Sequence, residues 1–105
     1  MQYRFAFALG VLFAMSSVSC EQEVSPEQHL KAGELLQEQR HLEEAIAQYD
    51  EAIRLDPWLA VAYIQRGLAY ADLGRFQRAI QDFNVAITLS PQAAEAYFMR
   101  GFRPI

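Results

Sequence analysis

The chain has 105 residues, of which 52% are apolar and 21% are charged, and its formal net charge is −4. This length fits at most one small domain, and the apolar fraction is too high for a disordered tail. The acidic balance argues against a nucleic-acid-binding protein. A single cysteine can form neither an intrachain disulfide nor a cysteine-rich zinc site.

The first 20 residues differ in composition from the rest of the chain. Arg4 is their only charge, an apolar block runs from Phe5 to Met15, and small serines follow it. This order is typical of a secretory signal peptide, and the run is shorter than the roughly 20 apolar residues that a transmembrane helix needs. Residues 1–19 are therefore predicted to be a signal peptide, with a retained signal anchor as the alternative.

The only cysteine, Cys20, directly follows the small residue Ser19. The stretch Ser17-Val18-Ser19-Cys20 resembles the lipobox of bacterial lipoproteins, although that family usually has Leu or a branched residue where Ser17 stands. The resemblance implies a lipid on Cys20, attachment to the membrane through that lipid, and a short linker over 20–25. In a diderm bacterium Glu21 favours the outer membrane and periplasm. Ordinary cleavage, which would leave a soluble secreted protein, is the alternative.

Three pairs of a capping residue and a proline mark predicted helix starts: Ser25-Pro26, Asp56-Pro57 and Ser90-Pro91. Between them, apolar residues at three- and four-residue spacing predict two amphipathic helices. One carries Leu42, Ala45, Ile46, Tyr49, Ala52 and Ile53, and the other Phe76, Ala79, Ile80, Phe83, Ala86 and Ile87. Residues 39–41 and Gly74 are predicted turns. Gly33 and Gly67 lie within helices, where we expect two helices to approach too closely for a Cβ.

An internal repeat organises this part of the chain, because residues 26–59 align with residues 60–93 at an offset of 34 without gaps. The shared positions resemble the tetratricopeptide repeat, or TPR. They are Gly33, Ala45, Tyr49, Ala52 and Pro57 in the first copy, and Tyr63, Gly67, Tyr70, Ala79, Phe83, Ala86 and Pro91 in the second. The resemblance implies an all-α fold, an α-solenoid of antiparallel helix pairs with TPR 1 over 26–59 and TPR 2 over 60–93.

A partial third copy begins at Ala94, and residues 94–105 are predicted to form one truncated helix. Pro104 falls where the third copy of the Tyr70 position is expected, so the helix cannot continue normally there. We expect Phe98 and Phe102 to be poorly covered. The chain is then either a fragment or frameshifted product of a longer repeat protein, which we favour, or its open end is sealed by a second chain.

In TPR proteins the first helix of each pair lines a groove that holds a peptide or a helix of a partner. The resemblance therefore implies a set of groove residues: Glu27, Leu30, Glu34, Gln37, Glu38, Val61, Ile64, Gln65, Leu68, Asp72, Glu95 and Phe98. The residues with which some TPR domains clamp a C-terminal carboxylate are absent from these positions. The set is acidic at one end and apolar further along, which suits a basic or amphipathic peptide. Ile64 and Leu68 are equally compatible with core packing.

No combination of residues indicates catalysis, a metal or a cofactor. The two histidines are predicted to be a packing residue (His29) and a solvated turn residue (His41), and the acidic pairs at 43–44 and 50–51 to form a solvated face. Charge is divided unevenly, because residues 21–59 hold ten acids and three bases, whereas residues 60–105 hold three acids and five bases. These charges are expected to lie on solvated helix faces; the alternative is an acidic end that binds a basic partner, or head-to-tail self-association.

Together these features predict a non-catalytic scaffold for protein–protein interaction, exported and lipid-anchored at the cell envelope. The alternative is a truncated regulatory TPR arm of a larger enzyme or of a secretion or pilus-assembly component. No nucleic acid is expected among the partners.

Overall fold

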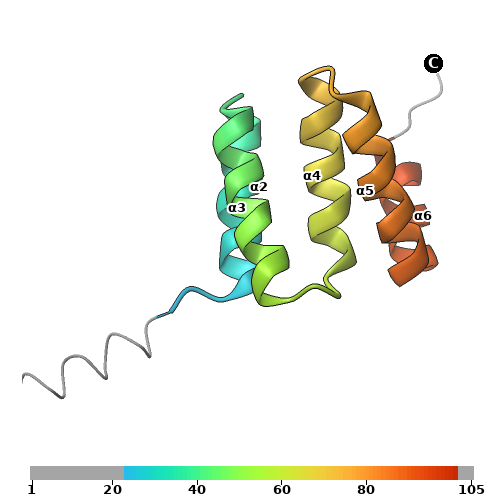
Figure 1. Cartoon of the computed structure of the whole chain (residues 1–105), viewed down its shortest axis with the longest axis horizontal. Helices are drawn as coiled ribbons and strands as arrows, with labels where there is room; N and C mark the ends of the chain where they lie inside the picture. The colour runs from blue at the N-terminus through green and yellow to red at the C-terminus, as the bar shows by residue number, and fades with distance from the viewer. Residues whose placement is uncertain (1–22, 102–105) are drawn as a thin grey trace, which may run out of the picture.

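A computed structural model describes residues 23–101, so Cys20, Phe102 and Pro104 lie outside the described residues. Five helices follow one another: α2 (Pro26–Glu38), α3 (Leu42–Leu55), α4 (Ala60–Asp72), α5 (Phe76–Leu89) and α6 (Pro91–Gly101). The chain between 23 and 101 contains no strand, and the predicted all-α solenoid is confirmed. In Figure 1, α3 stands in front of α2, α5 stands in front of α6, and α4 lies between α3 and α5.

Helices α2 and α6 begin as their sequences predict. At the start of α2, the backbone N–H of Gln28 donates to Ser25 Oγ at 3.2 Å, and the Ser25 N–H donates to Gln28 Oε1 at 2.9 Å. This capping box satisfies two backbone donors that a helix start leaves unpaired. Before α6, Ser90 Oγ accepts from the N–H of Ala93 at 3.3 Å. Each serine is followed by a proline at the first helical position.

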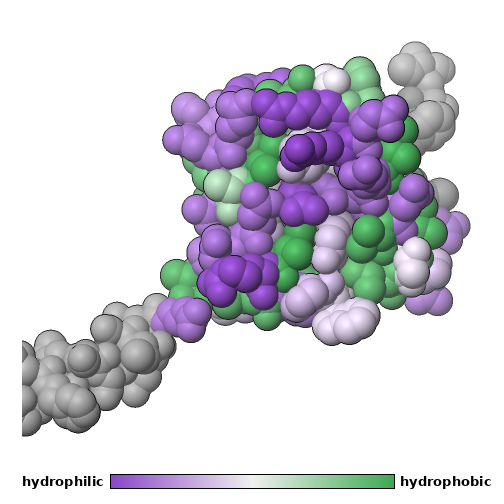
Figure 2. Space-filling view, viewed as in Figure 1, coloured by the Kyte–Doolittle hydropathy of each residue, from purple (hydrophilic) through white to green (hydrophobic). Residues whose placement is uncertain are grey.

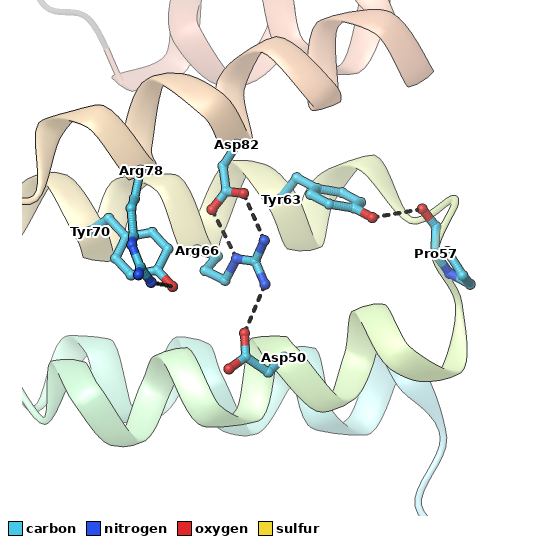
Figure 3. Close-up of polar contacts among 7 residues, drawn as sticks. All are labelled: Asp50, Pro57, Tyr63, Arg66, Tyr70, Arg78 and Asp82. Atoms are coloured by element: carbon cyan, nitrogen blue, oxygen red, sulfur yellow. Dashed lines mark hydrogen bonds and ion pairs between the residues drawn. The ribbon is translucent and has the colours of Figure 1, made fainter.

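The helix start predicted at Asp56-Pro57 is wrong, because α4 begins only at Ala60. The Asp56 side chain accepts from the N–H of Trp58 at 3.1 Å, and its carbonyl accepts from the N–H of Leu59 at 3.2 Å. These bonds close a turn between α3 and α4, in which a proline is equally favoured. The Tyr63 hydroxyl donates to the Pro57 carbonyl at 3.0 Å and ties the turn to α4 (Figure 3).

The turns inside the two helix pairs both require a positive φ. Arg40 has a φ of 67° and Gly74 a φ of 80°. A Cβ at Gly74 would meet no atom within 4 Å, so the backbone conformation alone favours glycine there. The predicted turns at 39–41 and at Gly74 are confirmed.

The two glycines within helices allow close packing inside each pair, as predicted. A Cβ at Gly33 would collide with the ring of Tyr49, and a Cβ at Gly67 would lie 2.6 Å from Cε1 of Phe83. Four alanines on the second helices are also buried: Ala45, Ala52, Ala79 and Ala86. Small residues therefore set the short distance between the helices of each pair.

The apolar stripes of α3 and α5 differ in how well they are covered. Leu42 and Ile46 of α3 are 8% and 7% exposed, and Ile46 lies in one cluster with Ala69 and Tyr70 of α4. The corresponding Phe76 and Ile80 of α5 are 62% and 52% exposed. Both helices are amphipathic as predicted, but the first stripe is buried except for half-buried Ile53, whereas the second leaves three of its six residues exposed. Over residues 23–101, no helix combines the length and the apolar character needed to cross a bilayer.

Candidate partner-binding groove

The first helices of the two pairs, α2 and α4, and the following helix α6 line an open hollow of about 500 Å³. Its walls are the side chains of Glu34, Gln37 and Glu38 from α2, Gln65 from α4 and Tyr97 from α6. Glu34, Gln37 and Glu38 lie within about one turn of α2, and the stacking of successive helices brings Gln65 and Tyr97 onto the same surface. The hollow therefore runs across the repeats, as a groove for an extended partner would.

Two side-chain hydrogen bonds hold the groove wall in place. The Tyr49 hydroxyl, from α3, donates to Gln37 Oε1 at 2.6 Å. Gln65 Nε2 donates to Glu34 Oε2 at 3.2 Å and connects α4 to α2. Because Tyr49 is fully buried in the core, its hydroxyl has a fixed position, and its hydrogen bond holds the Gln37 side chain in place. The wall is therefore positioned before any ligand arrives.

The groove has a negative electrostatic potential at its α2 side. Neither Glu34 nor Glu38 forms an ion pair with a described lysine or arginine. Burial raises the pKa of Tyr49 above its usual range, and the charges of Glu34 and Glu38 raise it further, because they disfavour a second negative charge nearby. The same field would favour an ammonium or a guanidinium group in the groove.

The structure brings together four of the predicted groove residues: Glu34, Gln37, Glu38 and Gln65. It adds Tyr97, which the sequence analysis did not assign to the groove. Tyr97 lies 34 residues after Tyr63, so the repeat gives its position along the helix, but the repeat pattern alone does not place its side chain in the groove wall.

The remaining predicted groove residues lie outside this hollow. Ile64 is fully buried with Ala86 and Ala94, so it belongs to the core, and Leu30 is half-buried against the core of the first pair. Phe98 points toward α5, where its ring meets Phe83 edge-on at 5.6 Å, yet it remains 39% exposed. The others are exposed or half-buried along the same helices: Glu27, Val61, Leu68, Asp72 and Glu95.

An ion-pair network that joins three helices was missed by the sequence analysis. Arg66 on α4 binds Asp82 on α5 through two parallel bonds of 2.9 and 2.8 Å, and Asp50 on α3 through a third of 2.8 Å (Figure 3). Asp82 is only 4% exposed. The hydrogen bonds that Arg66 donates to Asp82 and Asp50 raise the pKa of Arg66 even above its usual high value. This network fixes how the second helix pair sits on the first.

The acidic pairs at 43–44 and 50–51 lie on a solvent-exposed face as predicted, but the sequence did not indicate that acidic residues of this kind form ion pairs between the repeats. Glu43 on α3 binds Arg75 at 3.0 Å, and Asp72 on α4 binds Arg40 at 3.3 Å. Together with the Asp50 contact, these pairs cross from one repeat to the next. They were not predictable from spacing along one helix, because each joins residues 16 or 32 positions apart.

The histidines do not form a chemical site. His29 Nδ1 lies 2.7 Å from Gln48 Oε1 between α2 and α3, which agrees with its predicted packing role. His41 is exposed and lies 3.5 Å from Glu44. Among the described side chains, no three of His, Cys, Asp and Glu are close enough to hold a metal ion.

The repeat geometry agrees with a comparison against known families. A family model described as "Tetratricopeptide repeat" matches residues 32–102, which is more than half of the chain. The chain belongs to the tetratricopeptide repeat family. TPR domains generally mediate protein–protein interactions and are typically non-catalytic scaffolds. No curated protein matches the sequence.

Proposed function

We propose that this TPR protein is a non-catalytic binding module that is exported, anchored at the cell envelope by a lipid on Cys20, and binds a basic or amphipathic segment of a partner protein. The observation that carries the binding part is the pair of unneutralised carboxylates, Glu34 and Glu38, in the wall of a preformed groove. A lysine or arginine of the partner would enter between them.

The groove chemistry supports a peptide rather than a small molecule. Its wall is open and mixes carboxylates, amides and one phenol, so it offers hydrogen bonds to a peptide backbone as well as to a cation. Tyr97 contributes a ring on which the stem of a long cationic side chain can pack. An extended segment that follows α2, α4 and α6 would contact all three helices in turn.

The anchoring part of the proposal depends on the N-terminal pattern. A single charge at Arg4, an apolar block from Phe5 to Met15 and the lone Cys20 after small residues make a lipoprotein-type signal peptide. A lipid chain contributes about 0.8 kcal/mol per buried CH₂, so two or three chains hold a protein to a membrane durably.

A peptide titration tests the binding function. The full chain, kept in solution with a mild detergent, is titrated with a fluorescent lysine- and arginine-rich peptide and with a glutamate-rich peptide of the same length. We expect the basic peptide to bind more tightly and its affinity to fall as salt rises. Equal affinity for the two peptides, or preference for the acidic one, would contradict the proposal.

Cell fractionation tests the anchor separately. In a bacterial host that processes lipoproteins, the wild-type chain should appear in the membrane fraction, and Cys20→Ser should move it to the soluble periplasmic fraction. A Ser19→Ala variant, which keeps a small residue before the cysteine, serves as the control and should stay with the membrane. Membrane retention of Cys20→Ser would count against the lipid.

A further inference from the structure

The lipid proposed on Cys20 would hold one particular end of the molecule at the membrane, so the inference that follows rests on that anchor. Cys20 stands three residues before Glu23, where the described part of the chain starts. Three residues of chain span at most about 11 Å, whatever path they take. From Glu23 the chain leads directly into α2 at Pro26. The start of α2 must therefore lie close to the lipid headgroups.

The turn between α3 and α4 lies at the same end of the molecule. Because α2 and α3 run in opposite directions, α3 ends beside the start of α2, and the turn at 56–59 follows directly (Figure 1). Electrostatics agree with this placement. The pKa of Arg54, in the last turn of α3, is raised mainly by its hydrogen bond to Glu51 and also by the charge of Glu23. A membrane that holds the start of α2 would thus face this turn as well.

This turn exposes the only tryptophan of the chain. Trp58 is 76% exposed, and the neighbouring Pro57 is exposed too. The bond from the Trp58 N–H to Asp56 and the bond from the Tyr63 hydroxyl to the Pro57 carbonyl hold the backbone of the turn in place (Figure 3). The indole is therefore presented from a fixed support. A ring that combines an apolar body with one N–H donor is favoured at the interface between a membrane and water.

The opposite end of the molecule has a different character. The turns inside the two pairs expose Arg40 and Arg75. In Figure 2, strongly hydrophilic surface is extensive along the upper edge, whereas the lowermost surface, beneath α4, is pale and so of intermediate hydropathy. The end with Trp58 also has exposed acids at Glu23 and Glu27, and burying such charges in hydrocarbon is costly. This end therefore suits contact at the level of the headgroups and not deeper insertion.

We propose that Trp58 and the start of α2 contact the membrane together, with the indole among the lipid headgroups and the helices standing end-on to the bilayer. The indole is then a second fixed point beside the lipid, so the domain keeps one orientation. Glu34 and Glu38 come 8 and 12 residues after Pro26, or about 12 and 18 Å along α2. Because the groove runs across the helices, it lies parallel to the membrane at that height, and a basic segment of a partner would bind along the surface.

Intrinsic fluorescence tests the contact, because Trp58 is the only tryptophan in the chain. The full chain is produced in a bacterial host that processes lipoproteins, and mass spectrometry determines whether Cys20 carries lipid. The chain is then reconstituted into phosphatidylcholine vesicles with plain or brominated acyl chains, since bromine quenches tryptophan only at short range. We expect brominated lipid to quench Trp58 and the emission maximum to lie at a shorter wavelength than in water.

A matched variant moves the tryptophan to the other end of the helices. Trp58→Phe combined with Phe76→Trp places it on the first residue of α5, where Phe76 is 62% exposed. In the same vesicles this variant should emit as in water and resist quenching by brominated lipid. Circular dichroism verifies that its helices are retained. Equal quenching of the two chains would show that the domain has no preferred orientation and would overturn the proposal.

Flotation of the vesicles separates this contact from the anchor on which it rests. A lipid-bearing chain that floats with the vesicles while Trp58 stays unquenched would refute the contact and leave the anchor standing. A chain that carries no lipid on Cys20 and does not float would refute the anchor, and the contact with it. Flotation together with quenching of Trp58 alone is the result that the structure predicts.

Discussion

The second helices of the two pairs, α3 and α5, have nearly the same apolar pattern but different surroundings. Leu42 and Ile46 on α3 are buried, Ile46 against α4, whereas Phe76 and Ile80 on α5 are exposed. The difference arises from the neighbours and not from the helices, because a repeat buries its outer face only against the next repeat. An apolar residue at the same repeat position can therefore be a core residue in one pair and a surface residue in the next.

The largest loss of stability is expected in the ion-pair network that joins α3, α4 and α5. Arg66→Met removes the cation between Asp50 and Asp82 and leaves Asp82 buried without its partner, which should cost about 3 kcal/mol of unfolding free energy. Urea unfolding of the full chain, followed by circular dichroism, measures it. Arg54→Met breaks a solvent-exposed pair with Glu51 and should lower the free energy of unfolding far less. Similar costs for the two variants would show that the network does not hold the pairs together.

The apolar stripes themselves give the most direct contrast. Ile46→Ala should lower the free energy of unfolding by about 2–4 kcal/mol, because it opens a cavity under α4. Ile80→Ala, at the same repeat position, should cost less than about 1 kcal/mol, because that side chain is half in solvent. The experiment is done at low protein concentration so that self-association does not contribute. Equal losses would mean that α5 is covered as fully as α3.

The two buried glycines extend the contrast to the inside of each pair. Gly33→Ala forces the fully buried ring of Tyr49 to move and should cost about 2 kcal/mol. Gly67→Ala pushes against Phe83, which is only half-buried and can shift outward, so about 1 kcal/mol is expected. Thermal unfolding of the two variants gives the order. A larger loss of stability for Gly67→Ala than for Gly33→Ala would contradict the expectation that Phe83 shifts more easily than Tyr49.

The smallest effect is expected at the turns. Gly74→Ala should cost about 1 kcal/mol, because φ at this position is 80° and a Cβ is disfavoured there. Arg40 already adopts a φ of 67° with a side chain, so Arg40→Ala should cost less than about 0.5 kcal/mol, mainly through the exposed pair with Asp72. Denaturant midpoints of the two variants test this. A cost at Arg40 that matches the cost at Gly74 would show that its ion pair matters more than we infer.

Most of the fold was predictable because the repeat makes local and tertiary signals agree. The offset of 34 residues identified the turns, the close-packed glycines and the order of the helices. The error at Asp56-Pro57 shows the limit of a local rule, since an aspartate followed by a proline can begin a helix or close a turn. Only the bonds to Trp58 and Leu59 decide between them.

The features that were missed depend on contacts between repeats. Arg66 and Asp82 gave no local signal, because their pairing depends on how α4 and α5 are rotated against each other. The exposure of Phe76 and Ile80 depends on α6, and the place of Tyr97 in the groove depends on the stacking of three helices. Four groove residues were predicted because α2 and α4 keep the repeat register, whereas Ile64 lies one position from Gln65 and faces the core.

The central claim is that Glu34 and Glu38 make the groove a site for cationic side chains. The most direct measurement is the dissociation constant of the basic peptide for Glu34→Gln/Glu38→Gln, compared with Glu44→Gln/Glu51→Gln, which removes the same charge from α3 outside the groove. We predict about fivefold weaker binding for the groove variant and little change for the other. Equal weakening by both variants, or unchanged binding by the groove variant, would contradict the account.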